Sequence, residues 1–307
     1  MSKIKTLISL KKKNKDLIYP LGYNGFLNWM SDSMYLKLLF KSLMGYKLDL
    51  KNPVTFNEKL QWLKLHDRKN EYIGLVDKIE AKHIVGGIIG SDHIVPIIKI
   101  WKNAKQIDFD SLPNQFVLKC NHDQGSVIIV RNKEDIDKKK IVKFLTKCLK
   151  KNPYPGTREY PYKKIKPMVF AEKLLDANIV DYKFYCFHGE PLFLYCSKGL
   201  TEDHSLKIDF FDMEWNLMPF YRTDYNRLGK IPKPKKLGEM IKIAKELSKS
   251  IPFVRIDLFE VNDVVYFSEF TLYPASGFMP FVPNEYDKII GDYLVLPMNK
   301  KEANKNG

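Results

Sequence analysis

The spacing of apolar and polar positions along the chain predicts an alternation of helices and strands. Apolar residues at helical spacing predict a helix over 25–50, and Pro53 breaks this pattern. Thr55 and Glu58 have the spacing of a capping box, so we expect a second helix to follow them. Residues 152–166 contain Pro, Gly and Tyr and are expected to form a mobile loop between two lobes. The other expected helices span 75–85, 135–151 and 237–250, and the other expected strands span 94–100, 116–120, 127–130, 168–171, 183–188, 192–197 and 207–212.

Two further strands, 253–259 and 264–271, are β-branched and aromatic, and the pair Asn262-Asp263 between them favours a hairpin. A plain two-residue loop would place Ser268 opposite Asp257. Glu269 takes that place only if the loop has an odd number of residues or the hairpin contains a bulge.

In that second register, one face of the hairpin is apolar and the other is polar. The core face carries apolar residues, and the other face carries Arg255, Asp257, Glu269 and Thr271. Two carboxylates about 5 Å apart repel each other unless a cation lies between them. The cation is either Arg255 or a hard metal ion such as Mg²⁺, which takes oxygen ligands, and the residues leave both alternatives open.

A lysine inside an apolar strand marks a second candidate site. Lys119 lies in 116–120 and is followed by the polar loop 121–126. A buried lysine needs an anion beside it, Gly125 lets backbone amides approach phosphate oxygens, and Ser126 adds a hydroxyl. The pattern allows a phosphate-binding loop, although on this signal alone an ordinary hairpin whose edge-strand lysine reaches water is slightly favoured.

The strand that begins at 168 runs into Glu172, Lys173 and Leu175, which suggests a slot for a flat purine ring. Asp181 and Lys183 open the next strand. They can meet a ribose and a phosphate, or they can form a surface ion pair of little energetic value. The lone histidines His122 and His188 are more typical of structural positions than of proton carriers.

Composition narrows the class of protein. The 307 residues are 45% hydrophobic and 13% aromatic, as in a globular chain of two lobes or two domains. No apolar run is long enough for a membrane span, no secretory signal is evident, and the four cysteines lack metal-binding spacing. We therefore expect a cytoplasmic protein with reduced core thiols.

The formal charge of +15 favours anionic partners such as nucleotides, acidic glycans or an anionic membrane face. Much of it lies in Lys3–Lys15 and in the tail 299–307. The N-terminal stretch indicates either an amphipathic helix on the inner face of a membrane or simply a solvated, lysine-rich end. Nucleic acid is a weak expectation, because no zinc-finger or aromatic-glycine motif is present.

Taken in order, these residues resemble the ATP-grasp superfamily, and within it the TupA-like branch associated with bacterial surface polysaccharide synthesis. The resemblance covers 52–297. It rests on the motifs 52–59 with Trp62, Asp77-Lys78, 116–122, 181–189, 254–257 and 269–271. It implies an α/β fold in which two α+β lobes enclose ATP. The expected divisions are a helical segment 1–74, a small lobe 75–167 with the phosphate-covering loop, a C-terminal lobe 168–298 and a basic tail 299–307.

The resemblance also implies roles for individual residues. Lys78 and Lys119 would hold the α- and β-phosphates of ATP. The remaining nucleotide contacts would come from a covering loop with His122, Gly125 and Ser126, from an adenine hinge of Glu172, Lys173 and Leu175, and from Asp181 near the ribose.

On the hairpin, the resemblance implies that Asp257, Glu269 and Thr271 bind Mg²⁺. Arg255, which would stabilise an acyl-phosphate, and Lys183 are the expected catalytic residues. Two departures matter: Thr271 replaces the asparagine common in the superfamily, and Asp123 adds a negative charge near the expected phosphates.

The implied reaction is carboxylate activation by ATP, followed by attack of an amine to give an amide. The implied substrates are a surface glycan or its lipid-linked precursor bearing a uronic acid, and an amino acid or other amine. A glycosyltransferase is the alternative, although Asp209 and Asp212 do not have Asp-x-Asp spacing. A non-catalytic nucleotide-binding scaffold is the third candidate, because Thr271 is a weaker metal ligand.

Overall fold

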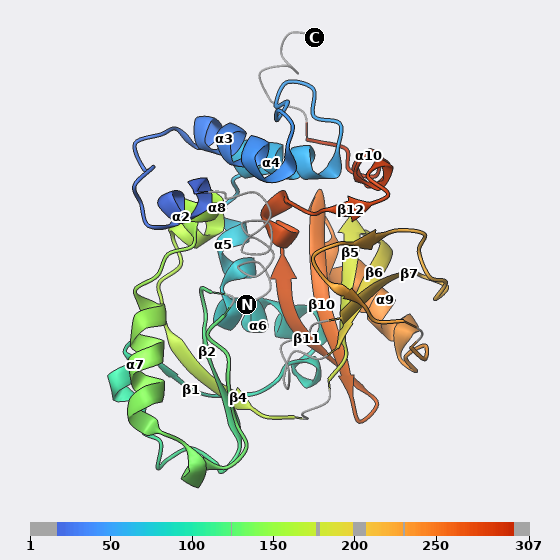
Figure 1. Ribbon diagram of the computed structural model, residues 1–307. Coiled ribbons are helices and arrows are strands. Elements are labelled where there is room, and N and C mark those ends of the chain that lie inside the picture. The colour runs from blue at the N-terminus through green and yellow to red at the C-terminus, as the bar shows by residue number, and fades with distance from the viewer. Residues whose placement is uncertain (1–16, 124, 176–178, 199–206, 230, 298–307) are drawn as a thin grey trace.

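Two large β-sheets, joined and capped by helices, form the framework of the described residues (Figure 1). The computed structural model describes residues 17–297 except 124, 176–178, 199–206 and 230. Lys3–Lys15, the candidate for membrane contact, and the basic tail 299–307 lie outside these residues.

The smaller sheet is antiparallel, in the order β1-β4-β2-β3. Its strands are β1 (Ile97–Trp101), β2 (Phe116–Cys120), β3 (Ile128–Val130) and β4 (Val169–Lys173). Helix α7 (Lys138–Leu149) begins where Asp137 accepts a hydrogen bond from the Lys140 amide. Its apolar residues Ile141 and Leu145 pack on this sheet to form one core, because the lysines of α7 occupy the opposite side.

The larger sheet has the order β11-β10-β5-β6-β7-β9, with only the β7–β9 pair parallel. Its strands are β5 (Asp181–Phe187), β6 (Glu190–Lys198), β7 (Lys207–Asp212), β9 (Asn226–Arg227), β10 (Phe253–Val261) and β11 (Val264–Thr271). Helix α9 (Leu237–Ser248) contacts β5, β6 and β10 through its apolar residues, including Met240 and Leu247. Buried aromatic side chains fill the core of this lobe.

Helices lie across one end of the molecule and between the sheets, as Figure 1 shows for α3, α4 and α6. These helices are α2 (Ile18–Tyr23), α3 (Asp32–Met44), α4 (Phe56–His66), α5 (Glu71–Val76), α6 (Lys78–Ile89), α8 (Tyr154–Thr157) and α10 (Glu285–Asp292). Short 3-10 turns span Ser91–His93, Ala104–Gln106, Lys133–Asp135, Tyr160–Lys163 and Pro274–Gly277, and β8 (Tyr221–Arg222) pairs with β12 (Phe281–Val282).

The predicted helix boundaries need correction at two places. The helix expected over 25–50 begins only at Asp32, because the Ser31 side chain accepts the Met34 amide and caps it, and it ends at Gly45 with φ 83°. The helix expected over 75–85 begins after Asp77, which caps it, and continues to Ile89. The capping box of Thr55 and Glu58 is confirmed at the start of α4.

Buried polar contacts fix α4 to the C-terminal part of the chain. Asn57 donates to Asp287 at 2.9 Å, and the fully buried Lys64 donates to the Ser276 carbonyl at 2.9 Å. Residues 152–166 are not a loose loop: they contain α8 and a 3-10 turn, and Arg158 and Glu159 are each 2% exposed. The sequence pattern misled because Pro and Gly there serve short packed turns.

The hairpin has the register that brings the two carboxylates together. Asn262 and Asp263 form a two-residue turn with φ of 52° and 61°, and Val261 pairs with Val264. A bulge then shifts the register, so that Asp257 pairs with Glu269 and Ser268 is the extra residue.

Strand β4 belongs to the smaller sheet, where it pairs with both β1 and β2. A boundary at 167/168 would cut this sheet, so the chain changes sheets only after Lys173. The division into functional lobes stays a prediction.

Two expectations from composition can be compared with the structure. All four cysteines are buried and free, as expected of core thiols. Among the described helices, none combines the length and the apolar character that crossing a membrane requires.

Candidate active site

A cleft with a volume of roughly 280 Å³ lies between the two sheets. Residues from β2 and β4 form one wall, and residues from β5, β10 and β11 form the other. The expected site residues all line this cleft except His122, Gly125 and Thr271. Segments more than 150 residues apart in sequence are therefore brought together as the ATP-grasp resemblance implies.

On the first wall, Glu172 is held between two lysines. Its carboxylate, 5% exposed, is paired with the Lys119 ammonium through Oε1 and with the Lys82 ammonium through Oε2, the second pair at 3.0 Å. Burial alone would raise the pKa of Glu172, but the charges of Lys119 and Lys82 hold it below its usual value. The Glu172 side chain therefore holds the ammonium groups of Lys82 and Lys119 in place.

Lys78 lies at the start of α6, where Asp77 caps the helix, and its amide donates to the Asn121 carbonyl at 3.1 Å. Its ammonium group donates to the backbone carbonyl of Asp123. The loop expected to cover phosphates is therefore tied directly to Lys78.

Within that loop, the Asp123 side chain is bonded to Ser126. Its carboxylate accepts hydrogen bonds from the amide and the hydroxyl of Ser126, and Ser126 in turn accepts the Cys120 amide at 2.8 Å. The hydrogen bonds from Ser126 are accepted by the negatively charged carboxylate of Asp123, which was expected to lie near the phosphates. His122 is buried, with Nε2 3.0 Å from the Lys151 carbonyl, and burial lowers its pKa.

The end of the cleft beside Lys173 and Leu175 is apolar. Val95, Ile179 and Phe259 also line it and pack with Leu175 in one small cluster. An apolar pocket at the end of β4 has the chemistry for a flat heterocycle. Asp181 lies on the opposite wall of the cleft, at the start of β5.

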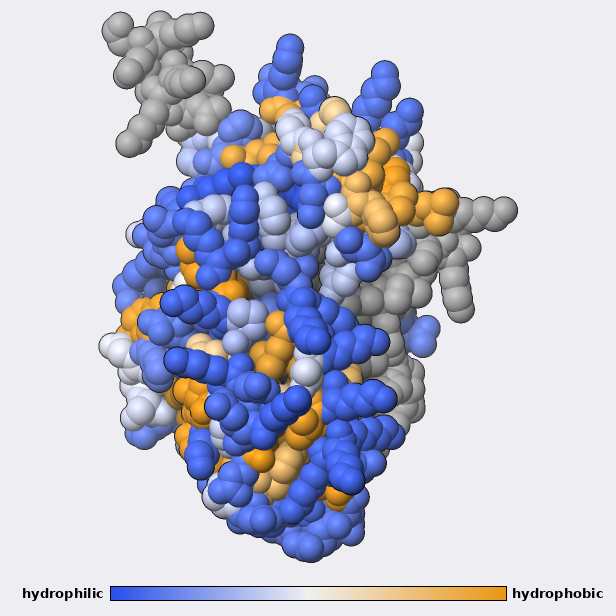
Figure 2. Space-filling model, turned by 90° about the vertical axis from the view of Figure 1, so that its left-hand side faces the viewer, coloured by the Kyte–Doolittle hydropathy of each residue, from blue (hydrophilic) through white to orange (hydrophobic). Residues whose placement is uncertain are grey.

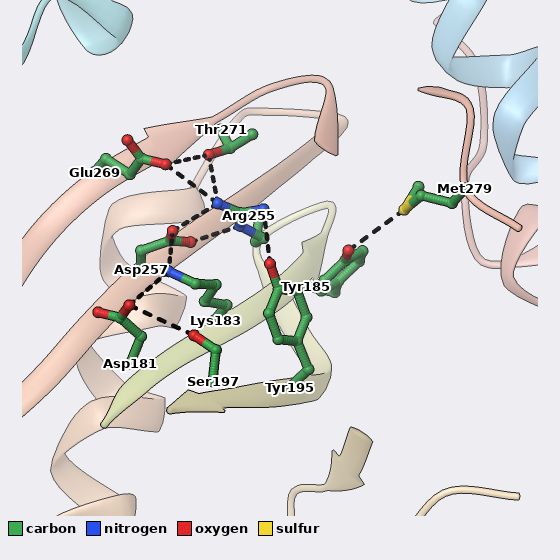
Figure 3. Close-up of polar contacts among 10 residues, drawn as sticks. All are labelled: Asp181, Lys183, Tyr185, Tyr195, Ser197, Arg255, Asp257, Glu269, Thr271 and Met279. Atoms are coloured by element: carbon green, nitrogen blue, oxygen red, sulfur yellow. Dashed lines mark hydrogen bonds and ion pairs between the residues drawn. The ribbon is translucent and has the colours of Figure 1, made fainter. Parts of the chain in front are cut away.

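The second wall is built around Arg255 (Figure 3). Its Nε and Nη2 each lie 2.6 Å from an oxygen of Asp257, which is fully buried. Nη2 also donates to Glu269 Oε1 at 3.2 Å and to the Thr271 hydroxyl at 3.0 Å. Of the two cations that the sequence allowed between the carboxylates, the structure therefore has Arg255 in that place.

Lys183 completes this wall. Its ammonium group lies 2.8 Å from Asp257 and 3.4 Å from Asp181, and Figure 3 shows it between the two carboxylates. Burial alone would lower the pKa of Lys183, but Asp181 and Asp257 raise it instead. Lys183 is therefore a fixed positive charge and not a proton acceptor at neutral pH.

Mg²⁺ prefers carboxylate and phosphate oxygens as ligands. Asp257, Glu269 and Thr271 supply oxygens of the correct type from neighbouring strand positions. Within the part of the chain that the structure describes, no group of three or more His, Cys, Asp or Glu can hold a metal ion. The residues fit a magnesium ion that takes its other ligands from ATP phosphates and water; their role as ligands stays a prediction.

Two residues of the site were missed at the level of sequence. Lys82 lies on the apolar face of α6 between Ile79 and Val85, and this position was a signal that a buried partner exists. Tyr195 accepts a hydrogen bond from Arg255 Nη1 at 3.2 Å. It could be found only from the pairing of β6 with β5, since nothing in its own segment marks it.

Comparison with known families identifies the chain. A family model described as TupA-like ATPgrasp matches residues 58–295. The chain belongs to this family. The match spans both walls of the cleft, so the fold class expected from the resemblance is confirmed.

Solved structures align with the chain at low sequence identity and with TM-scores below 0.5. L-amino acid ligase from Bacillus licheniformis aligns with a TM-score of 0.48 at 10% identity, covering 90% of this chain and 64% of that one. D-alanine–D-alanine ligases align at 0.40 and 15% identity for Helicobacter pylori (73% and 61% covered), and at 0.39 and 18% for the ATP complex from Bacillus anthracis (64% and 55%).

The chain spans less than two thirds of the length of each of these ligases. TM-scores below 0.5 transfer no residue role or substrate to this TupA-like protein. Comparison with curated proteins gives no match.

Proposed function

We propose that this TupA-like protein is an ATP-dependent ligase that joins a carboxylate to an amine through an acyl-phosphate. The observation that carries the proposal is the cleft itself. Lys78 and Lys119 line one wall, and Arg255, Asp257 and Glu269 line the other. A polyphosphate bound between them would lie within reach of cations from both sheets.

In this proposal, the adenine ring occupies the apolar end of the cleft beside Leu175 and Phe259, with Asp181 close to the ribose. The phosphates extend toward Lys78 and Lys119, and the loop with Gly125 and Ser126 covers them. Charge-assisted hydrogen bonds from two lysines account for much of the binding energy in such an arrangement.

The reaction takes place at the second wall. An oxygen of the substrate carboxylate attacks the γ-phosphorus of ATP, and the bond to ADP breaks. The amine nitrogen then attacks the acyl carbon, phosphate leaves, and the amine releases a proton to solvent. Arg255 is held rigidly by Asp257 and Thr271, so its guanidinium can stabilise developing negative charge without reorganisation.

Mg²⁺ brought with ATP would be held by Glu269, Asp257 and Thr271, and it would neutralise charge on the phosphoryl oxygens. Both oxygens of Asp257 already accept from Arg255, and one also accepts from Lys183. Glu269, 26% exposed, is the better placed of the two carboxylates to face an incoming ion.

The proposed carboxylate substrate is a uronic acid of a surface glycan or its lipid-linked precursor. The exposed lysines of α7 support an anionic partner. Lys138, Lys139 and Lys143, together with Lys105, line a shallow hollow of roughly 580 Å³. Figure 2 shows the side of the molecule that carries α7, where hydrophilic side chains predominate over its lower half.

Peripheral contact with the inner face of a membrane is the finer part of the proposal. Phe26 and Trp29 are 68% and 74% exposed, and Lys37 and Lys41 of α3 are exposed nearby in sequence. Aromatic and basic side chains together favour an anionic membrane surface.

In a test of this contact, the protein should sediment with vesicles that contain phosphatidylglycerol. The double variant Phe26→Ser/Trp29→Ser should bind these vesicles more weakly than the control Leu217→Ser. Equal losses of vesicle binding in the two variants would contradict the contact.

One observation favours the scaffold alternative: Asp257 is fully engaged by two cations, as a purely structural carboxylate would be. The glycosyltransferase alternative has no such support. Asp209 and Asp212 do not line the cleft, and Asp209 is buried against Arg227.

The test is incubation with ATP, Mg²⁺ and a panel of uronic acids paired with amino acids. We expect release of ADP and phosphate that depends on both a carboxylate and an amine. Release of AMP, or turnover of a UDP-sugar without ATP, would contradict the ligase. Tight ATP binding with no turnover across the panel would favour the scaffold.

A further inference from the structure

Lys82 is the least accessible cation that lines the cleft beside Glu172. Its side chain is 6% exposed, against 25% for Lys119. The Lys82 ammonium donates to the Val95 carbonyl at 2.9 Å and is paired with Glu172 at 3.0 Å. Both lysines line the cleft and pair with Glu172, but the Lys119 side chain is the more accessible of the two.

One carboxylate therefore has two lysine partners of different accessibility. When a phosphate of ATP takes Lys119, Glu172 loses one counter-charge. A buried carboxylate left without a cation is strongly unfavourable. Lys82 remains in contact with the second oxygen of Glu172 and meets this requirement.

We infer that Lys82 is a positioning residue that holds Glu172 in place, so that Lys119 can leave it for the phosphates of ATP. The inference rests on the proposed binding of ATP in this cleft. Lys82 itself does not touch the nucleotide: its ammonium group is already engaged by Val95 and Glu172. Lys82 acts through the charge of Glu172. Replacing Lys82 should therefore weaken ATP binding only while Glu172 is ionised.

The direction of the Lys82 pKa agrees with this geometry. Burial lowers the pKa of Lys82, and Glu172 opposes that effect. Without Glu172 the Lys82 ammonium would be buried beside only a carbonyl. The two residues therefore depend on each other, which a double-mutant cycle can measure.

The experiment is calorimetric titration with a non-hydrolysable ATP analogue and Mg²⁺, which needs no knowledge of the other substrates. The proteins are wild type, Lys82→Met, Lys82→Arg, Glu172→Gln and Lys82→Met/Glu172→Gln. We expect Lys82→Met to weaken analogue binding by about tenfold, which corresponds to about 1.4 kcal/mol. Lys82→Arg keeps the charge and should bind within about threefold of wild type.

The decisive comparison is Glu172→Gln against the double variant. With Glu172 neutral, Lys119 no longer needs to be released, so adding Lys82→Met should change affinity by less than about twofold. A further tenfold loss in the double variant would show that Lys82 acts independently of Glu172 and would overturn the inference. An unchanged affinity in Lys82→Met would also overturn it.

A failure of the variant to fold and a failure of the proposed function can both be distinguished from a failure of the role of Lys82. If Lys82→Met fails to fold, judged by circular dichroism, the comparison of Glu172→Gln with the double variant still decides. If the wild type does not bind the analogue, the proposed function fails, and the role of Lys82 fails with it. Wild-type binding combined with additive variants would sink only the role of Lys82.

Discussion

The two walls of the cleft use the same motif in different ways. On each wall a buried carboxylate lies between two cations: Glu172 between Lys82 and Lys119, and Asp257 between Arg255 and Lys183. On the first wall one cation is 25% exposed, and the three residues come from α6, β2 and β4.

On the second wall both cations are largely buried, at 8% and 13%, and all the residues come from adjacent strands. A cation that can leave its carboxylate is suited to bind a ligand, whereas one that is fixed is suited to stabilise a transition state. Under the proposed function, the first wall would bind the nucleotide and the second would carry the chemistry.

The largest expected effect is on the second wall. Arg255→Met leaves the fully buried Asp257 with Lys183 alone, so the free energy of unfolding should fall by about 3–5 kcal/mol. Chemical denaturation measures this. Glu269→Gln, at a partly exposed position, should cost less than about 1 kcal/mol and is the control. Equal losses in the two variants would mean that Arg255 is not the centre of this wall.

A second prediction concerns turnover. Glu269→Gln keeps the shape of the side chain and removes the charge that attracts a hard cation, so ATP turnover should fall by about 100-fold. Binding of ATP should change by less than about threefold, because the lysines of the first wall are intact. Turnover at the wild-type rate would make Glu269 a structural partner of Arg255 only.

The hairpin could be predicted because its signals are local. The strand residues and the Asn262-Asp263 turn lie within 20 residues, and only the bulge at Ser268 was left open. The first wall was harder to predict. Lys82 meets Glu172 across 90 residues, and neither segment alone indicates the other.

The features that the sequence did not predict, namely the sheet that β4 joins and the contact of Tyr195 with Arg255, also depend on pairing between distant segments. A run of consecutive apolar residues identified β4 as a strand, but it carried no information about which sheet the strand joins. Tyr195 was missed because its contact with Arg255 depends on the order of strands β6, β5 and β10. Local patterns predict elements, and long-range pairing decides which side chains meet.

A third prediction sharpens the role of the first wall. Lys119→Ala should weaken ATP binding by about 10- to 100-fold, the effect of one hydrogen bond to a charged group. Its unfolding free energy should fall by less than that of Arg255→Met, because Lys82 still partners Glu172 and Lys119 is the more exposed cation. The matched control is Lys99→Ala, an exposed lysine of the same sheet that does not line the cleft, and it should match wild type in both measurements.

The smallest expected effect is a pH dependence. Because the pKa of Glu172 is lowered in the folded protein, its contribution to stability is complete above the usual glutamate pKa of about 4.3 and is lost as the pH falls through the lowered value. The difference in Tm between wild type and Glu172→Gln should be constant from neutral pH to about pH 5 and shrink below that. A difference that grows in acid would contradict the paired, ionised Glu172.

The most direct test of the division between the two walls is calorimetric titration of Lys119→Ala and Glu269→Gln with ATP and Mg²⁺, side by side. The account predicts that Lys119→Ala loses most of the ATP affinity and that Glu269→Gln retains it. If both variants lose affinity equally, or if Glu269→Gln loses more, nucleotide binding does not belong to the first wall and the account is wrong.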